Sequence, residues 1–587
     1  MVPVIVIALY LVVVAYVGSL AYRRGKQNTE DFFLASRSIG SLVFFLSIFA
    51  TNMTAFAILG SSGAAYRQGI GIFGMMASSS GLIIPLTIFF IGTRIWALGK
   101  KFGHQTQVAL FRDRWECSGI GTAIFTLSAV MLIPYMIVSI IGGGTVLNQI
   151  SVENGHPLIP YWFGCLIVAL VVTMIVFLGG MRGVVWVNIF QTILFVLFGT
   201  VAALVISGNL PGGFGETLHR LGMSPRGGAL LARDRLPQEV FWSYTFIPLS
   251  SIMFPHMSIM CLSARRMSAF KNTVIAYPIA IMLTWLPCVF LGVVGASVFS
   301  GLSPSEADGI LLKLLHQYSP LWLAGLLGAG IMSAVMGSDC HQILALSTMF
   351  TKDIFAHYGG KEKYGERGSV LFARAFVILA TIIAYFIALK ASSGIFELAV
   401  RFAFTGFAAM APVMIAALFW KRSTKWGALA STLWVASCLG GTWWLQAISD
   451  DIARKPPSAP PARVASGLPL PARPGSPMGQ AAAPNPTGSG VSVAPGGPAS
   501  ARQRNGSGGA GRGPRKPPPS SVPIFPPSQV FERSAVNVTI FGFLPVVPMV
   551  LGSAFWMILV SLMTKPPSKE TIDRYFSPAE EPSPALA

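Results

Sequence analysis

Charged residues are scarce in this sequence. Only 11% of its 587 residues are Asp, Glu, Lys or Arg, whereas soluble domains carry about 25%. Apolar runs of about 20 residues recur along the chain, and each is long enough to cross a hydrocarbon core about 30 Å thick as a helix. These two features exclude an ordinary soluble domain and predict an all-α polytopic membrane protein.

The sequence also lacks the motifs of common enzymes and metal sites. Its six cysteines contain no CxxC pair and no pairing pattern, which argues against a zinc site and a disulfide framework. It has no HExxH, no P-loop, no Ser/His/Asp order and no paired buried carboxylates. We therefore predict that the protein is not an enzyme.

Acidic residues are few, with 22 Asp and Glu against 42 Lys and Arg, so the net charge is +20. The Lys and Arg lie mainly between apolar runs, where the positive-inside rule explains them, and we exclude nucleic-acid binding.

The alternation of basic loops predicts an external N-terminus and a cytoplasmic C-terminus in the inner membrane. Residues 2–22 lack a preceding basic region and a cleavage site, which predicts a retained span.

The apolar runs predict about thirteen transmembrane helices. They are residues 2–22, 40–62, 70–93, 118–143, 160–178, 185–207, 240–263, 273–299, 320–350, 369–391, 395–418, 426–448 and 537–563. Residues 450–534 are rich in Pro, Ala, Gly, Ser and Arg, and we predict a disordered insert there. The chain then divides into a transmembrane core over 1–448, this insert, and a last span with a cytoplasmic tail over 535–587.

The second predicted span carries hydrogen-bonding side chains at bilayer depth. Thr51, Asn52 and Thr54 lie in its middle, and residues 60–63 (GSSG) follow. One interpretation is a helix that unwinds beside a cavity, where free carbonyls can hold a cation. The alternative is that the hydroxyls bond their own backbone or a neighbouring helix.

The span over 320–350 contains an acidic residue, Asp339, and a histidine, His341. An ionisable residue inside a membrane span is costly and therefore marks a candidate functional site. The alternative is that Asp339 lies near the cytoplasmic end, where water reaches it.

Several motifs resemble those of the sodium:solute symporter family. They are residues 31–40 (DFFLASRSIG), 50–54 (ATNMT), 66–69 (YRQG), 179–182 (GGMR) with Trp186 and Gln191, 254–256 (FPH) and 333–355. They follow the family's order and spacing over roughly residues 10–440. The resemblance implies a leucine-transporter-like core of two five-helix inverted repeats, over about 40–207 and 240–418. The spans over 40–62 and 240–263 would be unwound at mid-depth, and their polar or Pro breaks agree.

The resemblance also implies a sodium site. Its ligands would be the backbone carbonyls of Ala50, Met53 and Ala334 and two positions where the family has hydroxyls, Gly337 and Ser338. Gly337 departs from the family because glycine has no side-chain oxygen, and sodium favours several hard oxygen ligands. Asn188 is a second departure, since many members have Asp there. Asp339 or His341 could compensate by charge or by carrying a proton.

The resemblance places the solute between the spans over 40–62, 118–143, 240–263 and 395–418. The residues it implies are Thr51, Asn52, Tyr135, Ser251, Pro255 and His256, with Tyr244 as a gate. Packing is the alternative role for the aromatic residues. Ile247 and Ser251 replace the Trp and Tyr of proline-transporting members, which argues against proline. The motifs are closer to the monocarboxylate and pantothenate branch.

We therefore predict a sodium:solute symporter that imports a small organic solute, such as a monocarboxylate, by alternating access. Its partners would be that solute, the sodium ion and the lipid bilayer, with no obligatory protein partner. The departures at Gly337 and Asn188 leave two alternatives. One is proton-coupled or uncoupled transport, and the other is a membrane sensor that has lost transport.

Overall fold

The computed structural model describes residues 1–24, 29–232, 235–391, 395–454, 521–525, 528–534 and 538–576. Residues 455–520, which hold most of the predicted disordered insert, lie outside the described residues. The described elements belong to one compact unit, formed by Met1–Asp450 and Ser520–Ala587, except for the last four residues of α23 (Lys425–Arg454).

Nine helices among the described residues are long and apolar enough to cross a membrane, or eleven if each of two bent pairs is one span. The single helices are α1 (Val2–Arg24), α8 (Ser118–Ile150), α9 (Tyr161–Asn209), α15 (Ser268–Val298), α19 (Gly360–Ala388) and α24 (Val546–Met563). The others join shorter segments: α5 (Gly71–Thr87), η3 (Ile88–Gly92) and α6 (Thr93–Phe102); α18 (Leu321–Met349) and η6 (Phe350–Phe355); α20 (Ile395–Leu398), η7 (Ala399–Phe404), α21 (Thr405–Ala409) and α22 (Ala411–Phe419). The predicted all-α polytopic class is confirmed.

The predicted count of thirteen spans is not confirmed. The spans expected over 160–178 and 185–207 form one element, α9, which bends at Gly180 (φ 51°, ψ −148°). Its 49 residues would measure about 73 Å if straight, at 1.5 Å per residue, which is enough for two crossings. The span expected over 426–448 falls in α23, which is not among the nine.

The two bent pairs are the spans expected over 40–62 and 240–263. The first consists of α3 (Ser41–Asn52), η2 (Phe56–Gly60) and α4 (Ser61–Gln68), bent by 59°. The second consists of α12 (Gln238–Ser243), η5 (Tyr244–Leu249), α13 (Ser250–Met253) and α14 (Pro255–Ser263), bent by 51°. Each expected repeat therefore begins with an interrupted helix.

The C-terminal part differs from the prediction. β3 (Ser521–Phe525) and β4 (Ser528–Ser534) pair antiparallel inside the segment predicted to be disordered, and β5 (Val538–Ile540) pairs with β4. The helix expected to begin at 537 therefore begins at Val546, as α24. The β-branched residues of β5 suit a strand, and Gly542 adopts φ 80° in the turn that follows.

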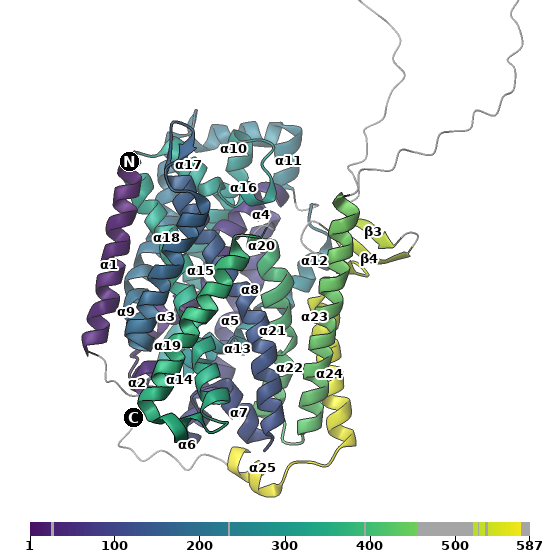
Figure 1. Ribbon diagram of the computed structural model, residues 1–587. Helices are drawn as coiled ribbons and strands as arrows, with labels where there is room; N and C mark the ends of the chain where they lie inside the picture. The colour runs from purple at the N-terminus through teal and green to yellow at the C-terminus, as the bar shows by residue number, and fades with distance from the viewer. Residues whose placement is uncertain are drawn as a thin grey trace, which may run out of the picture. The chain divides into compact units, whose positions relative to one another are not determined.

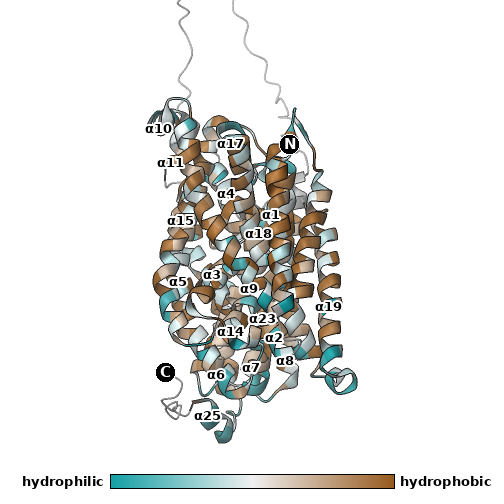
Figure 2. Cartoon of the chain, turned by 90° about the vertical axis from the view of Figure 1, so that its left-hand side faces the viewer, coloured by the Kyte–Doolittle hydropathy of each residue, from teal (hydrophilic) through white to brown (hydrophobic). Residues whose placement is uncertain are grey.

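Apolar side chains cover the outside of the long helices. On α1, Ile5 and Leu9 are 63% and 64% exposed, whereas Tyr10 and Val14 on the opposite face are buried. Figure 2 shows hydrophobic residues along α1, α15 and α19 and hydrophilic residues near their ends. Such exposed apolar surface suits a lipid environment rather than water.

Short elements lie at the two ends of the long helices (Figure 1). One end carries α10 (Gly213–Met223), α11 (Pro225–Leu231), α16 (Pro304–Ala307) and α17 (Ile310–Tyr318), and β1 (Val152–Glu153) pairs with β2 (His156–Pro157). The other end carries α2 (Thr29–Leu34), η1 (Ala35–Arg37), α7 (Gln107–Arg114) and α25 (Lys569–Phe576). Basic loops meet at this second end, since Lys101 donates to the carbonyl of Arg574 and Arg422 to that of Leu562.

Candidate functional site

The first break lies between Asn52 and Ala55. Met53 leaves the helical conformation (φ −87°, ψ 104°), and the Thr54 hydroxyl accepts a hydrogen bond from the Phe56 backbone at 3.1 Å. Thr54 therefore satisfies a backbone donor at the start of the second half. The last carbonyls of α3 lose their usual helical partners, which makes them available as cation ligands.

The second break lies at Phe254, whose ψ of 119° is extended. The residue before a proline avoids the helical region, and Pro255 follows directly. A second proline, Pro248, lies inside the 3-10 segment η5. Gln107 of α7 donates to the freed Met253 carbonyl at 2.9 Å and accepts from Ser258 at 2.8 Å, so it bridges the two halves.

Aromatic rings from the four expected spans meet beside both breaks. Tyr135 of α8 stacks on Phe254 with ring centroids 5.2 Å apart, and His256 stacks on Phe254 at 4.9 Å. Phe404 contacts Tyr135 at 5.1 Å and Phe56 at 4.7 Å, both edge to face. We call these five residues the aromatic cluster. It lies where the solute was predicted.

The aromatic cluster holds buried polar atoms without partners. Neither ring nitrogen of His256 has a hydrogen-bond partner among the described residues. The Tyr135 hydroxyl lies near Thr54 but makes no hydrogen bond of good geometry. Buried polar groups are usually paired, so these atoms are candidates for contacting a solute.

Other predicted solute residues use their polar groups inside the protein. Thr51 donates to the Ser47 carbonyl at 2.6 Å, and Ser251 donates to the Pro248 carbonyl at 2.8 Å. Asn52 donates to the Tyr277 hydroxyl at 2.6 Å. Tyr244, the predicted gate, is buried in η5. The backbone-bonding alternative given for the second predicted span therefore describes Thr51 in this conformation. Ser251 is bonded in the same way.

The predicted sodium ligands come from α3, its break and α18. All except Gly337 have a buried side chain: Ala50, Met53, Ala334 and Ser338. A Cβ added to Gly142 of α8 would lie 2.5 Å from Ala55 Cβ and 3.4 Å from Val335 Cγ2. The break and the ligand-bearing part of α18 therefore meet at this glycine.

Gly337 faces two side-chain amides of α9. A Cβ at this position would lie 3.0 Å from Asn188 Oδ1 and 3.0 Å from Gln191 Oε1. Both oxygens are buried and lack a hydrogen-bond partner among the described residues. Their nitrogens are occupied, because Asn188 Nδ2 lies 2.9 Å from His341 Nδ1 and Gln191 Nε2 donates to the Tyr10 hydroxyl at 2.9 Å. Two free oxygens thus stand beside the position that lacks a hydroxyl.

Asp339 and His341 are both buried in α18. Neither carboxylate oxygen of Asp339 has a hydrogen-bond partner in the described part of the chain, and the same holds for His341 Nε2. The alternative that water reaches Asp339 does not fit this burial. A carboxyl without partners is costly inside a membrane, so Asp339 is a candidate for carrying a proton or facing a cation.

Motif residues at the α25 end form ion pairs. Asp31, from the 31–40 motif, pairs with Arg182, from the 179–182 motif, at 2.5 Å. Asp353 accepts from Thr106 at 2.9 Å and lies 3.8 Å from Arg112. These contacts tie α2 to α9 and α7 to η6, which indicates that these motifs hold the helices in place.

A second polar cluster lies near the opposite ends of the helices. Arg67 of α4 pairs with Glu397 of α20 at 2.7 Å, and Asp308 accepts from the Ile395 backbone at 2.7 Å. Burial and the nearby Glu397 carboxylate raise the pKa of Asp308 well above its ordinary value. A Cβ on Gly63 would lie 2.3 Å from Asp308 Oδ1, so this glycine permits the close approach.

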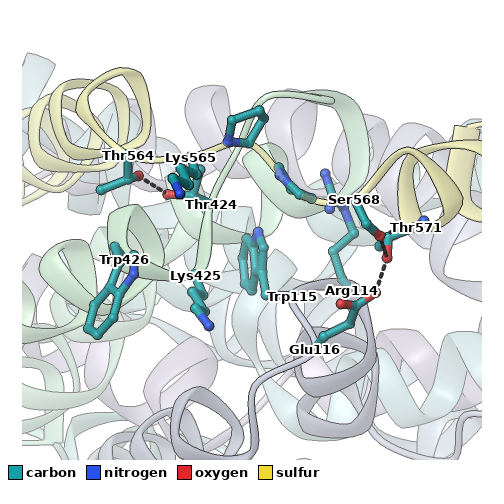
Figure 3. Close-up of a pocket in the computed structure, with 12 residues that line it drawn as sticks. Arg114, Trp115, Glu116, Thr424, Lys425, Trp426, Thr564, Lys565, Ser568 and Thr571 are labelled. Atoms are coloured by element: carbon teal, nitrogen blue, oxygen red, sulfur yellow. Dashed lines mark hydrogen bonds between the residues drawn. The ribbon is translucent and has the colours of Figure 1, made fainter.

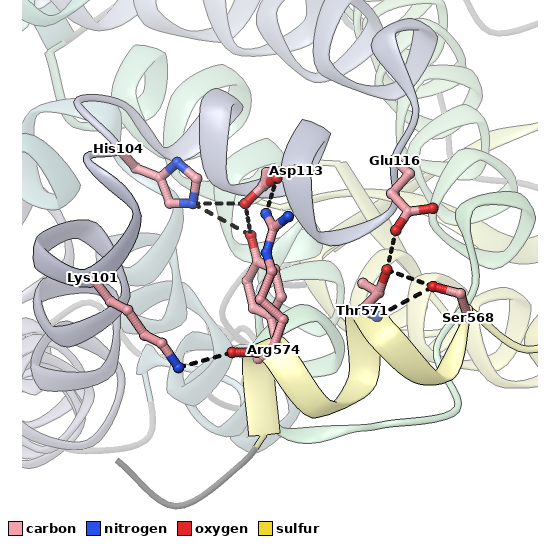
Figure 4. Close-up of polar contacts among 8 residues, drawn as sticks. Lys101, His104, Asp113, Glu116, Ser568, Thr571 and Arg574 are labelled. Carbon is pink, nitrogen blue, oxygen red and sulfur yellow. Dashed lines mark hydrogen bonds and ion pairs between the residues drawn. The ribbon is translucent and has the colours of Figure 1, made fainter. Parts of the chain in front are cut away.

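Helix α25 is anchored by a polar network (Figure 4). Arg574 pairs with Asp113, and the Tyr575 hydroxyl donates to the same carboxylate at 2.5 Å. Partial burial raises the pKa of Asp113, but these hydrogen bonds outweigh it and lower the pKa below 3.8. His104 Nε2 lies 3.2 Å from Asp113, and burial lowers the pKa of His104 below 6.5.

Sequence reasoning missed the phenylalanines of the aromatic cluster and the amide oxygen of Gln191. The chain has 40 Phe, so a single Phe in an apolar run carries no signal of a site. Gln191 stood out only as part of a family motif. Its position opposite Gly337 depends on how α9 packs against α18.

Comparisons with known proteins bear on the family and the fold of the chain. Residues 32–434 match the sodium:solute symporter family. The sodium/proline symporter of Haemophilus influenzae is 25% identical, over 73% of this chain and 86% of its own. The sodium/pantothenate symporter of the same organism is 24% identical, over 73% and 88%. The solved structure of a Na⁺-coupled sialic acid symporter, 17% identical, aligns with a TM-score of 0.62 over 76% of this chain and 91% of that one, which shows a shared fold.

Proposed function

The chain belongs to the sodium:solute symporter family, and from this membership we propose that it imports a small organic acid. As a member, it is a multi-pass membrane protein that couples the movement of a solute to that of sodium.

The observation that carries the proposal is the set of unpartnered polar atoms in the aromatic cluster. A site that is mostly apolar with a few polar groups suits a small solute with one polar end. The N–H of the His256 imidazole and the hydroxyl of Tyr135 can donate hydrogen bonds to a carboxylate, which accepts them well. The motif resemblance to the monocarboxylate and pantothenate branch supports the same class.

The proposed sodium site combines backbone and amide oxygens. The carbonyls of Ala50, Met53 and Ala334 and the hydroxyl of Ser338 supply part of the shell. Asn188 Oδ1 and Gln191 Oε1 replace the hydroxyl that Gly337 lacks, because both are buried, free and next to it. Neutral oxygen ligands of this kind suit a hard cation.

We place the N-terminus outside and the C-terminus in the cytoplasm, because the basic loops meet at the α25 end. External sodium then binds first and steadies the first break against α18, solute binds beside it, and the core opens inward. At a potential of about 100 mV, negative inside, each sodium contributes about 2.3 kcal/mol to uptake.

The test is uptake of radiolabelled monocarboxylates into proteoliposomes under an inward sodium gradient. We expect sodium-dependent uptake of a monocarboxylate and none of proline. His256→Gln should raise the solute KM, and Ser338→Ala should raise the sodium concentration for half-maximal uptake. Ser347→Ala is the matched control, since its hydroxyl bonds to the Ala373 carbonyl. Sodium-dependent uptake of other solutes only would refute the substrate class, and unchanged uptake without sodium would refute the proposed ion site.

A further inference from the structure

A pocket of about 440 Å³ lies at the α25 end of the protein, apart from the solute site. Its walls come from the turn between α7 and α8, the start of α23 and the connection between α24 and α25. Figure 3 shows side chains from these three segments around one space. The network that anchors α25 also closes the pocket, because Thr571 of α25 donates to Glu116 of the turn.

The lining is strongly basic. Arg114, Lys425 and Lys565 line the pocket, and Glu116 is its one acidic residue. The Glu116 carboxylate accepts a hydrogen bond from Thr571. Among the described residues, none of the three cations forms an ion pair. The pocket therefore has an excess of positive charge.

Arg114 is the deepest of these cations and is fully buried. Its Nε donates to the Ala417 carbonyl at 3.0 Å and its Nη2 to the Trp420 carbonyl at 3.2 Å, at the C-terminal end of α22. Its Nη1 has no hydrogen-bond partner among the described residues. Burial lowers the pKa of Arg114 to about 10, so the side chain remains a cation at neutral pH.

A buried cation normally has an anionic partner, because removing it from water is costly. The carbonyls of α22 supply partial negative charge to one side of the guanidinium. The Phe576 ring also lies 5.1 Å from the guanidinium carbon. Nη1 still has no hydrogen-bond partner among the described residues, and Arg114 lines the pocket together with two lysines. The lining also includes Trp115 and Trp426, a residue type that is common at the membrane interface.

We propose that this pocket binds a phosphate-bearing anion through Arg114 Nη1, Lys425 and Lys565. Phosphate oxygens accept charge-assisted hydrogen bonds from Arg and Lys. The two sources of such a group are the headgroup of an anionic lipid and a soluble phosphate compound. Basic pockets at the cytoplasmic ends of membrane helices bind lipid headgroups in this way. The bound anion would link the end of α7, the start of α23 and the connection between α24 and α25.

The test uses the full-length protein in detergent and follows its Tm. The added compounds are dioctanoyl phosphatidylglycerol, dioctanoyl phosphatidylcholine and inorganic phosphate, at an ionic strength held constant with chloride. We expect the Tm to rise with phosphatidylglycerol or with inorganic phosphate but not with phosphatidylcholine. A response to phosphatidylglycerol alone identifies a lipid headgroup, and a response to phosphate identifies a soluble anion.

The variants separate this pocket from general attraction to a basic surface. Lys425→Gln and Lys565→Gln leave Arg114 and its contacts with α22 intact, and each should raise the apparent Kd of the active compound roughly tenfold. Lys421→Gln is the matched control, because Lys421 is exposed in the same loop but does not line the pocket. Equal responses in all three variants, or no response to either anion, would overturn the proposal. The readout does not involve transport, so it is independent of the solute.

Discussion

Replacing Gly337 by alanine is the most direct test of the two amides of α9 as sodium ligands. The new Cβ would lie 3.0 Å from Asn188 Oδ1 and 3.0 Å from Gln191 Oε1. These distances are a few tenths of an ångström too short, so both amides must shift. Crowding of this kind typically costs about 1 to 3 kcal/mol. Because amide side chains can rotate, we expect the lower part of this range.

A loss of about 1 to 2 kcal/mol corresponds to a roughly five- to thirtyfold weaker sodium affinity. The assay is the sodium dependence of solute uptake in proteoliposomes, and the half-maximal sodium concentration should rise by that factor. Gly328→Ala is the control, because the nearest neighbours of its Cβ would be apolar side-chain carbons, of Ile150 at 3.1 Å and Ile7 at 3.3 Å. If Gly337→Ala changed the half-maximal sodium concentration no more than Gly328→Ala, the amides would not be ligands.

Three further predictions concern contacts outside the sodium site. Arg182→Gln leaves the buried Asp31 with only its weaker partners and should lower the free energy of unfolding by about 2 to 3 kcal/mol, measured by denaturation. The Asp31→Asn/Arg182→Gln double variant should recover part of this loss. Acidification should weaken the attachment of α25. Because the pKa of His104 is lower in the folded protein than its ordinary value of 6.5, the folded state is stable above pH 6.5 and loses stability as the pH falls below that value. Hydrogen exchange in α25 should therefore rise between pH 6.5 and 5 in the native protein but not in His104→Asn. Gly63→Ala should reduce uptake by pushing Asp308 away from α4, whereas Gly81→Ala, with nothing within 4 Å of its Cβ, should transport normally.

The two interrupted helices could be predicted because their causes are local. Polar residues at 51–54 and the proline at 255 disturb a helix wherever it packs. The same local reasoning failed at Val538–Ile540, since an apolar run does not show whether it will pair with a strand. The exact count of thirteen spans stays a prediction, because the two spans expected within α9 are joined across a bend at Gly180 and its 49 residues are enough for two crossings.

The partners within the site could not be predicted, because they are distant in sequence. Asn188 and Gln191 lie about 150 positions before Gly337, and only the packing of α9 on α18 brings them together. The aromatic cluster joins rings from residues 56 to 404. The sequence also identified Asp339 as ionisable without showing whether water reaches it, which depends on the surrounding helices.

The break after α3 also has a consequence for biogenesis. The 12 residues of α3 rise only about 18 Å, well short of the roughly 30 Å of hydrocarbon. When this segment leaves the ribosome, neither half is long enough to cross the hydrocarbon by itself. The unwound residues between the halves would expose peptide groups without hydrogen bonds to lipid. The nascent segment therefore needs helices synthesised later in the chain to cover it: α9 and α15 pack against α3, and Gly142 of α8 approaches Ala55 at the break.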